Sequence, residues 1–418
     1  MGLNSHWNRR GFLAMASTIA GALLSPYKLF SSNGKTVARS ASVNGFGSSG
    51  NPYEELGVTT VINCEGTMTM LGGSLPHPEL EAVMTMAGRH FVSMPELEAA
   101  AGKRIAEMLK LPEGYFAFVT AGAAAAIESG LAGILTGGNE TLIRQLPDLT
   151  GMKSEVIIQK SHRNPFDHQL RSTGAKLIEI ETVEDLRRAV SDRTAMMHFS
   201  NFANAVGQIK VDEWVKLAKQ YNVPCMNDAA ADTPPVSHLW DYANMGYDLI
   251  TFSGGKAIRG PQCAGLLIGR RELVANALLN NCPYEDTIGR SQKVGKEEIL
   301  GMVKALDLFL AEDHDALARE WQSRLEMISR ELTKVPGVST TFFVPDIANH
   351  VPHMRIVWDE ARVSLTPEQA AKLLRTGKPS IVITHGEGPG LSMNSFMLQP
   401  GEDKIVATQL SALLHQHA

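Results

Sequence analysis

The chain contains the segment Leu249-Ile-Thr-Phe-Ser-Gly-Gly-Lys256-Ala-Ile-Arg-Gly-Pro-Gln-Cys-Ala-Gly-Leu-Leu-Ile-Gly269, in which two apolar runs flank a glycine-rich turn with one lysine. The runs, Leu249 to Phe252 and Cys263 to Ile268, predict two buried strands. Lys256 is therefore expected at a strand end among apolar residues. Partial dehydration there lowers the pKa of an amine toward the neutral form, which attacks carbonyl groups to give a Schiff base. Since Ser-x-x-Lys is a short string, this segment alone fits a surface hairpin lysine equally well.

A second segment, Val223-Pro-Cys-Met-Asn-Asp228-Ala-Ala230-Ala-Asp232, predicts a short strand that ends in a carboxylate and is followed by small residues. A carboxylate at such a place can pair with a protonated pyridine nitrogen, and the methyl group of Ala230 can lie flat under an aromatic ring. Asp228 precedes Lys256 by 28 residues (256 − 228), which accommodates two strands and their connection. Taken singly, Asp228 would be a helix cap or a structural acid.

A third segment, Ala117-Phe-Val-Thr-Ala-Gly122-Ala-Ala-Ala-Ala-Ile, predicts a strand, a tight turn and a helix start. The backbone N–H groups of Gly122, Ala123 and Ala124 would face an anion there, and their small side chains would let a phosphate approach. The hydroxyl of Ser253 is a fourth candidate donor. Each segment alone has a structural explanation, but in this order a phosphate turn, a ring aspartate and a lysine describe a site for pyridoxal 5'-phosphate.

The segments resemble a fold-type I pyridoxal-phosphate enzyme of the branch that contains selenocysteine synthase (seryl-tRNA selenium transferase) and D-glucosaminate-6-phosphate ammonia-lyase. The resemblance covers Pro52 to the C-terminus. It implies an α/β fold with a mainly parallel sheet in a large domain and a small C-terminal α+β domain. The strings that carry the resemblance are Gly57-Val-Thr-Thr-Val-Ile-Asn63, Thr120-Ala-Gly-Ala-Ala-Ala, Ser161-His-Arg163, Ser253-Gly-Gly-Lys256, Gly260-Pro-Gln-Cys-Ala-Gly265 and Leu398-Gln-Pro-Gly-Glu402.

The periodicity of apolar residues supports the same organisation. From Tyr115 onward short apolar runs alternate with helical stretches, a pattern typical of a parallel sheet covered by helices on both faces. From Lys296 a long helical period follows, with a break expected at Asp313, and then strands and a helix that begins after Thr366. The predicted domains are 1–50 (signal and linker), 51–295 (arm and large cofactor-binding domain) and 296–418 (connecting helix and small domain).

Two further residues have candidate roles that stay open. The resemblance places His162 against the exposed face of the cofactor ring, whereas a lone histidine is more often structural. Arg355 could bind a substrate carboxylate with two hydrogen bonds, or it could be a strand arginine that faces solvent. No metal site is predicted, because the four cysteines are widely spaced. Three of these cysteines lie in apolar or strand-like sequence and are expected to be buried free thiols.

The first residues predict export. Arg9-Arg10-Gly-Phe-Leu13 followed by an apolar run to Leu24 resembles a twin-arginine signal, and the run is too short to span a bilayer. A Ser/Gly-rich linker follows from Ser31 to Gly50. We expect a mature periplasmic or exported protein that starts between Ala38 and Pro52, without a stable membrane anchor. The alternative is a disordered cytoplasmic extension with a chance arginine pair.

The amino-acid composition limits the kinds of molecule that this chain is expected to bind. The chain has 418 residues, 44% of them hydrophobic, and a formal net charge of −5, with no lysine- or arginine-rich block. No nucleic-acid surface is therefore expected.

The apolar side chains of Val58, Val61 and Ile62 in the N-terminal arm need a surface to cover them, and the resemblance implies a homodimer or a larger assembly.

The predicted function is pyridoxal-phosphate chemistry at Cα and Cβ of an amino acid or amino-sugar acid, with Lys256 as the base. The first choice is a β-eliminating lyase that releases ammonia and a keto acid. An amino-acid racemase or epimerase is the alternative, with His162 as its second acid. A selenium transferase is disfavoured, because residues 383–390 lack an arginine often found there in selenocysteine synthase and no tRNA-binding domain is recognisable. A non-catalytic pyridoxal-phosphate-binding protein is disfavoured by the intact Lys256 and Asp228.

Overall fold

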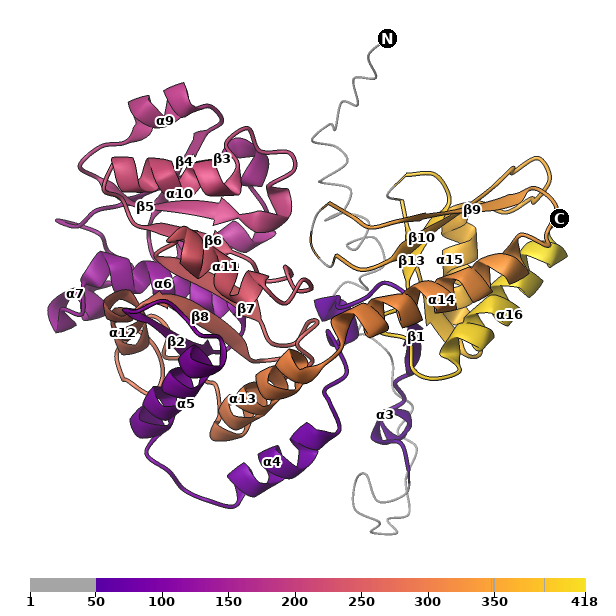
Figure 1. Ribbon diagram of the computed structural model, residues 1–418, viewed down its shortest axis with the longest axis horizontal. Helices are drawn as coiled ribbons and strands as arrows, with labels where there is room; N and C mark the ends of the chain where they lie inside the picture. Colours follow the sequence, from indigo (N-terminus) through magenta and orange to yellow (C-terminus); the bar gives the residue numbers. More distant parts are fainter. Residues whose placement is uncertain (1–49, 347, 349, 387) are drawn as a thin grey trace, which may run out of the picture. The chain divides into compact units, whose positions relative to one another are not determined.

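The computed structural model describes residues 50–346, 348, 350–386 and 388–418, which form two compact units (Figure 1). The larger unit comprises Thr67–Arg319 and Val344–Val351, and the smaller unit comprises residues 50–66, Glu320–Phe343 and Pro352–Ala418. The predicted signal, and all of the predicted linker except Gly50, lie outside the described residues. Whereas the sequence places a domain boundary at residue 296, the structure groups residues 296–319 with the larger unit.

The larger unit is built on a seven-stranded sheet of the order β2-β8-β7-β6-β5-β3-β4. The strand β8 runs antiparallel to both its neighbours, and the other strands are parallel to one another. This arrangement confirms the mainly parallel sheet of the predicted fold. The strands are β2 (Tyr115–Thr120), β3 (Glu155–Gln159), β4 (Lys176–Ile180), β5 (Thr194–Ser200), β6 (Cys225–Asp228), β7 (Leu249–Ser253) and β8 (Gly265–Arg270).

Helices cover both faces of this sheet, as Figure 1 shows for α6 (Ala123–Thr136) and α10 (Val211–Gln220). A Cβ atom at Gly130 of α6 would lie 2.4 Å from the Met226 methyl group, so the small residue permits close packing. On the opposite face the fully buried Trp214 of α10 lies 5.8 Å from the Phe199 ring. The other helices of this unit are α4 (Glu79–Gly88), α5 (Met94–Met108), α7 (Glu140–Gln145), α8 (His168–Ser172), α9 (Val183–Ala189), α11 (His238–Met245), α12 (Arg271–Leu279) and α13 (Lys296–Ala311).

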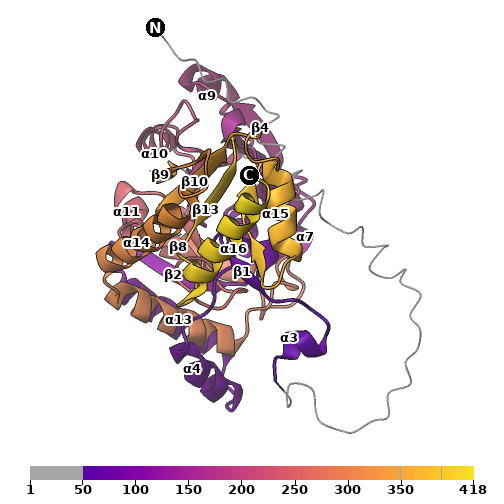
Figure 2. The same cartoon turned by 90° about the vertical axis from the view of Figure 1, so that its right-hand side faces the viewer.

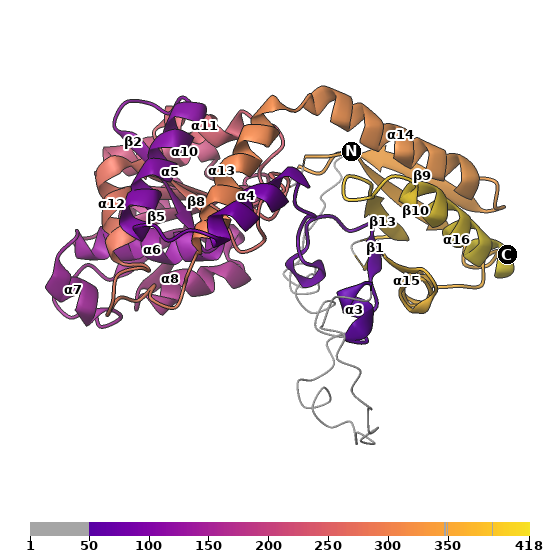
Figure 3. The same cartoon turned by 90° about the horizontal axis from the view of Figure 1, so that it is seen from below.

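The helix α13 lies beside α4 and α5, which explains why it belongs to the larger unit (Figure 3). The next helix, α14 (His314–Leu332), begins in the larger unit and continues in the smaller one. The break between the two helices falls at Glu312 and Asp313, which confirms the predicted irregularity. Among the described residues, no helix is long and apolar enough to cross a membrane.

The smaller unit contains an antiparallel sheet, β12-β13-β10-β9, and a parallel pair, β1-β11. The helix α15 begins with a capping box between Thr366 and Gln369, as predicted. In Figure 2 the helices α14 and α16 lie side by side. The elements are α3 (Pro52–Glu55), β1 (Val61–Asn63), β9 (Val338–Phe343), β10 (His353–Trp358), α15 (Pro367–Thr376), β11 (Ser380–Val382), β12 (Thr384–His385), β13 (Leu391–Asn394) and α16 (Glu402–Gln416).

The cysteines are free thiols, but they are not uniformly buried. Cys64 and Cys225 are buried, Cys282 is partly exposed and Cys263 is exposed. The prediction of three buried thiols is therefore wrong. The apolar run that contains Cys263 does not begin as a strand, because β8 starts only at Gly265, after a turn in which the Ala264 amide donates to the Pro261 carbonyl.

Candidate active site

Three of the sequence segments meet at one edge of the seven-stranded sheet. Gly265, the first residue of β8, is in register with Thr120 at the end of β2 and with Ser253 at the end of β7. Asp228, the last residue of β6, is in register with Thr251 of β7. Since β2, β6 and β7 are parallel, their carboxyl ends share this edge, where ligands bind in open α/β sheets.

The N-terminus of α6 is open to an anion. Gly122 has φ +88°, a conformation that favours glycine, and no side chain caps the helix at this residue. The first amide groups of a helix, here those of Ala123 and Ala124, have no acceptor within it. The Thr120 hydroxyl donates to the Gly122 carbonyl over 2.8 Å and holds the turn. The fourteen-residue helix therefore presents donors and the positive end of its dipole to a phosphate.

Asp228 is buried with its carboxylate at the sheet edge. It is 5% exposed, and its Oδ1 accepts a hydrogen bond of 3.2 Å from the Ala230 amide. Burial raises the pKa of this carboxyl group, while the Lys256 ammonium and the Ala230 amide lower it. A buried carboxylate needs a cationic partner, and a protonated pyridine nitrogen is such a partner.

Lys256 lies in the turn after β7. Burial lowers the pKa of its amine from the ordinary value, and the charge of Asp228 opposes part of this shift. The amine is thus easier to deprotonate than an exposed lysine and lies near the carboxylate that would hold the ring. Lys256 therefore has the buried surroundings that are expected of a nucleophilic lysine.

The turn that carries Lys256 is held from both ends. The Gly254 amide donates to the Ala264 carbonyl over 2.8 Å, and the Gly260 amide donates to the Gly254 carbonyl over 2.8 Å. The Arg259 amide donates to the Lys256 carbonyl over 2.9 Å. These hydrogen bonds fix the backbone of the turn from which the Lys256 side chain extends.

A loop far away in sequence covers the same turn, which the sequence did not indicate. The Ser74 amide donates to the Gly255 carbonyl over 2.9 Å, and the Arg259 side chain donates to the Leu75 carbonyl over 2.9 Å. A Cβ atom at Gly73 would lie 2.5 Å from the Gly255 carbonyl oxygen. Glycine at position 73, with φ +75°, is therefore required for this close approach.

His162 lies at the end of the 3₁₀ helix η2 (Lys160–His162) and is fully buried. Its Nδ1 accepts a hydrogen bond of 3.2 Å from the Ser200 amide, and its ring meets Phe199 edge to face at 4.5 Å. Burial, with the charges of His198 and Lys210, lowers its pKa to about 3. His162 is therefore neutral at physiological pH, and its role beside the ring stays a prediction.

Arg355 belongs to the smaller unit, on β10. Its Nη1 donates to the Pro389 carbonyl over 3.2 Å, and its guanidinium lies 5.5 Å from the centre of the Phe343 ring. A Cβ atom at Gly388 would lie 2.9 Å from that Nη1, so glycine makes room for the arginine. Substrate binding by Arg355 stays a prediction.

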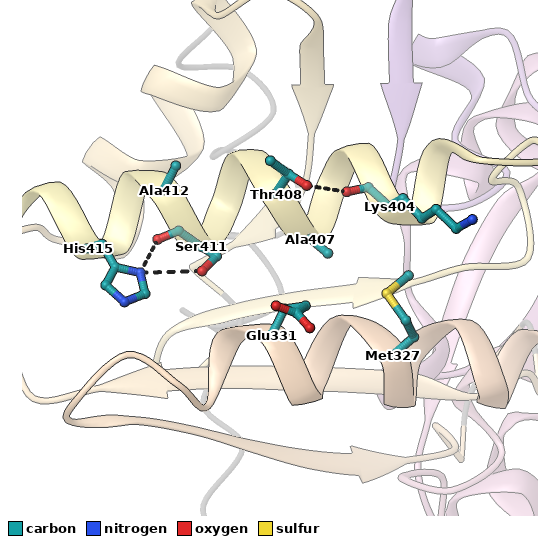
Figure 4. Close-up of a pocket in the computed structure, with 8 residues that line it drawn as sticks. All are labelled: Met327, Glu331, Lys404, Ala407, Thr408, Ser411, Ala412 and His415. Atoms are coloured by element: carbon teal, nitrogen blue, oxygen red, sulfur yellow. Dashed lines mark hydrogen bonds between the residues drawn. The ribbon is translucent and has the colours of Figure 1, made fainter.

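The smaller unit also has a groove of about 530 Å³ between α14 and α16 (Figure 4). It is lined by Met327 and Glu331 on one side and by Ala407, Ser411 and other residues of α16 on the other. Figure 4 shows that the α16 side chains hydrogen-bond within their own helix, as Thr408 does to the Lys404 carbonyl. None of the candidate cofactor residues lines this groove.

The donor set of the larger unit fits pyridoxal 5'-phosphate. The uncapped α6 N-terminus suits its phosphate, the buried Asp228 suits its ring nitrogen, and Lys256 suits its aldehyde. Ala230 and Ser253 are neighbours, because the Ser253 amide donates to the Ala230 carbonyl over 3.2 Å. No group of three or more metal-ligating side chains occurs among the described residues.

The junction between β8 and α6 provides a test of the phosphate turn. A Cβ atom at Gly265 would lie 2.5 Å from the carbonyl carbon of Gly122 and 2.7 Å from the Ala123 amide nitrogen. We expect Gly265→Ala to push the turn away, to cost about 1–3 kcal/mol of stability and to weaken cofactor binding. Denaturant unfolding and cofactor titration measure both effects. Gly88→Ala, at the end of α4 with ordinary space around its Cβ, is the control, and equal behaviour of the two variants would contradict this geometry.

Comparison with known proteins agrees with this site. The model of the family "Aminotransferase class-V" matches residues 168–354. A 5'-C-glycyluridine monooxygenase-decarboxylase of Streptomyces sp is 28% identical over 87% of this chain and 92% of that protein. The D-glucosaminate-6-phosphate ammonia lyase of Salmonella typhimurium is 25% identical over 88% of this chain and 99% of that protein. A solved structure of D-glucosaminate-6-phosphate ammonia-lyase superposes with a TM-score of 0.76 at 23% identity and covers 88% of this chain and 99% of that one. The chain thus has the fold-type I architecture, and it is an enzyme whose cofactor is pyridoxal 5'-phosphate.

Proposed function

We propose that this protein is a pyridoxal-phosphate-dependent lyase that eliminates the β-substituent of a 2-amino-3-hydroxy acid of the amino-sugar acid type. The observation that carries the proposal is the Lys256–Asp228 pair beside the α6 N-terminus. It is joined by similarity to an ammonia lyase over almost the whole length of that protein. The net reaction converts the amino acid into ammonia and a 2-keto-3-deoxy acid.

The cofactor, when bound, withdraws electrons from Cα. Residues of the chain bind the cofactor and move the protons. The α6 N-terminus binds the phosphate, and the Asp228 carboxylate holds a proton on the ring nitrogen. The neutral amine of Lys256 takes the proton from Cα, and burial, which lowers the pKa of this amine, favours the neutral form.

A racemase would need a second acid on the opposite side of Cα. His162 is the candidate that the sequence offers, but its lowered pKa keeps the imidazole neutral at neutral pH, and a neutral imidazole is a weak acid. This favours elimination over racemisation.

The test is incubation of the purified holoenzyme in deuterated water with 2-amino-3-hydroxy acids, including amino-sugar acids with and without a phosphate group. We expect ammonia and a keto acid with one deuterium at C3. Deuterium at Cα with loss of chirality and no keto acid would identify a racemase instead.

We also propose that the enzyme works as a homodimer or a larger assembly, and that it binds no nucleic acid. In the larger unit, large apolar side chains are exposed around α4, and the Phe91 side chain is fully exposed. Such clusters mark contact surfaces. In the predicted arm, Ile62 is buried within the smaller unit and Val58 is exposed. Light scattering should give a mass of at least two chains, and a lower mass for Phe91→Ser. A fully active monomeric wild type would refute the proposal.

Export by a twin-arginine signal is the third part of the proposal. Residues 9 and 10 lie outside the described residues, and the support is the motif together with the cofactor. This export route carries folded proteins, and the cofactor binds only a folded site. We expect replacement of both arginines by lysine to leave active, full-length protein in the cytoplasm. An unchanged distribution between cell fractions would show that the segment is no signal.

A further inference from the structure

A cluster of polar side chains lies one turn beyond Asp228, and the roles assigned above to the cofactor-binding residues do not include it. The chain turns tightly after β6, because the Asp232 amide donates to the Ala229 carbonyl and the Ala229 amide donates to the Thr251 carbonyl, each over 3.0 Å. Asp232 thus stays at the sheet edge beside β7. The charge of Asp232 raises the pKa of Asp228, so the two carboxylates are within electrostatic reach.

The Asp232 carboxylate is the centre of this cluster. It is 3% exposed and accepts hydrogen bonds from Asn201 Nδ2 at 2.6 Å and from the Tyr242 hydroxyl. His238 Nδ1 lies 3.1 Å from its Oδ2 and 2.7 Å from the Asp232 carbonyl oxygen. Burial raises the pKa of Asp232, but the hydrogen bonds from His238, Tyr242 and Asn201 outweigh burial and lower it. The carboxylate is therefore ionised at neutral pH.

His238 is the member of the cluster that can exchange a proton with a ligand. Both contacts of Nδ1 are to acceptors, so Nδ1 carries a proton and the ring orientation is fixed. Among the described residues Nε2 has no hydrogen-bond partner, and the side chain is 23% exposed. Burial lowers its pKa, but the hydrogen bond and charge of Asp232 more than compensate, so the pKa of His238 is raised.

The other charged and titratable groups around His238 are consistent with a protonated ring. Tyr242, 5.2 Å away between ring centres, has a raised pKa because of burial and the Asp232 charge, so it stays a neutral phenol. Asp241, on the same helix, adds a second negative charge that favours the imidazolium. His350 lies 6.2 Å from His238 between ring centres, and its Nε2 is 4.0 Å from Asp232 Oδ1.

To break the Cβ–O bond of a 2-amino-3-hydroxy acid, one proton must leave Cα and another must reach the departing oxygen, and Lys256 accounts for the first. Hydroxide is a poor leaving group, so the Cβ–O bond breaks readily only when the oxygen receives a proton as it departs. A carboxylate that fixes one nitrogen of an imidazole and leaves the other to the reactant is a proven arrangement for such transfers.

We propose that Asp232 and His238 form an acid–base dyad, in which His238 Nε2 gives its proton to the departing β-hydroxyl group and Asp232 positions the imidazole. The proposal rests on the lyase function proposed above. The Cα proton passes to Lys256, the Cβ–O bond breaks with its electron pair on oxygen, and this oxygen takes the Nε2 proton and leaves as water. Neutral His238 then takes a proton back from solvent, the Lys256 ammonium delivers a proton that has exchanged with solvent to Cβ, and water hydrolyses the resulting imine to ammonia and the keto acid.

The decisive experiment compares two leaving groups in wild type and His238→Gln. With a 2-amino-3-hydroxy acid we expect kcat of the variant to fall about 10²–10⁴-fold. With a β-chloro amino acid, whose chloride leaves without a proton, we expect a fall of less than about tenfold, since no general acid is needed. His168→Gln, at an exposed histidine of α8 in the same unit, should match wild type with both substrates.

Each outcome has one meaning. An equal fall with both leaving groups would show that His238 is only structural, and no fall would show that it is not used; either overturns the dyad. A wild type that eliminates neither substituent overturns the lyase proposal itself.

A measurement on the apoprotein tests the pairing independently of turnover. The rate of diethylpyrocarbonate modification of His238, followed by peptide mass spectrometry against pH, gives its pKa. We expect Asp232→Asn to lower that pKa by at least about one unit, because it removes the adjacent charge. In the holoenzyme the alkaline limb of the rate profile should move to lower pH in the same variant. An unchanged pKa would overturn the role of Asp232.

Discussion

Lys256→Ala is expected to lower kcat by about 10⁴-fold or more while the protein stays folded, because one amine both binds the cofactor and takes the Cα proton. The turn around it is held by backbone bonds among Gly254, Gly260 and Ala264, which alanine leaves in place. Steady-state rates and far-UV circular dichroism measure the two parts of this expectation.

Lys103→Ala is the matched control, since this lysine is exposed on α5 and 75% of its side chain faces solvent. Wild-type turnover in the control and residual turnover near wild type in Lys256→Ala would together remove Lys256 from the chemistry.

Asp228→Asn is expected to lower the rate between about ten- and ten-thousand-fold without loss of bound cofactor. Asparagine keeps the shape and can still accept the Ala230 amide. It lacks the charge that holds a proton on the ring nitrogen, so the cofactor would withdraw electrons less strongly. Stopped-flow rates and the ratio of cofactor to protein after gel filtration separate the two effects.

Asp212→Asn controls for the loss of one carboxylate. Asp212 is on α10 and pairs with the exposed Lys216. A rate for Asp228→Asn equal to that of this control would mean that Asp228 serves only the fold.

Much of the larger unit could be predicted from local sequence. Buried parallel strands are continuous apolar runs, so the run Leu249 to Phe252 locates β7 (Leu249–Ser253) nearly to the residue. The motif order also gave Gly122, Asp228 and Lys256, since each follows such a run. The direction of β8 could not be predicted, because an apolar run does not encode whether a strand is parallel or antiparallel to its neighbours.

The other parts of the site depend on contacts between residues that are far apart in the sequence. The dyad and its neighbours join η4 (Asn201–Ala203), the turn after β6, α11 and the segment Val344–Val351. Asp232 lay within a segment already singled out, but only the fold brings His238 and Tyr242 to its carboxylate. Likewise, nothing in Gly73-Ser74-Leu75 indicates that it covers the Lys256 turn; the requirement for glycine appears only when the Gly255 carbonyl lies against it.

The central claim is that one lysine carries the cofactor. Borohydride reduction of the purified holoenzyme, followed by proteolysis and mass spectrometry, attaches the pyridoxyl group permanently to the lysine that holds it. We predict the label on Lys256, in the peptide that contains Ser253-Gly-Gly-Lys256. A label on any other lysine, or cofactor that washes away unreduced, would contradict the account.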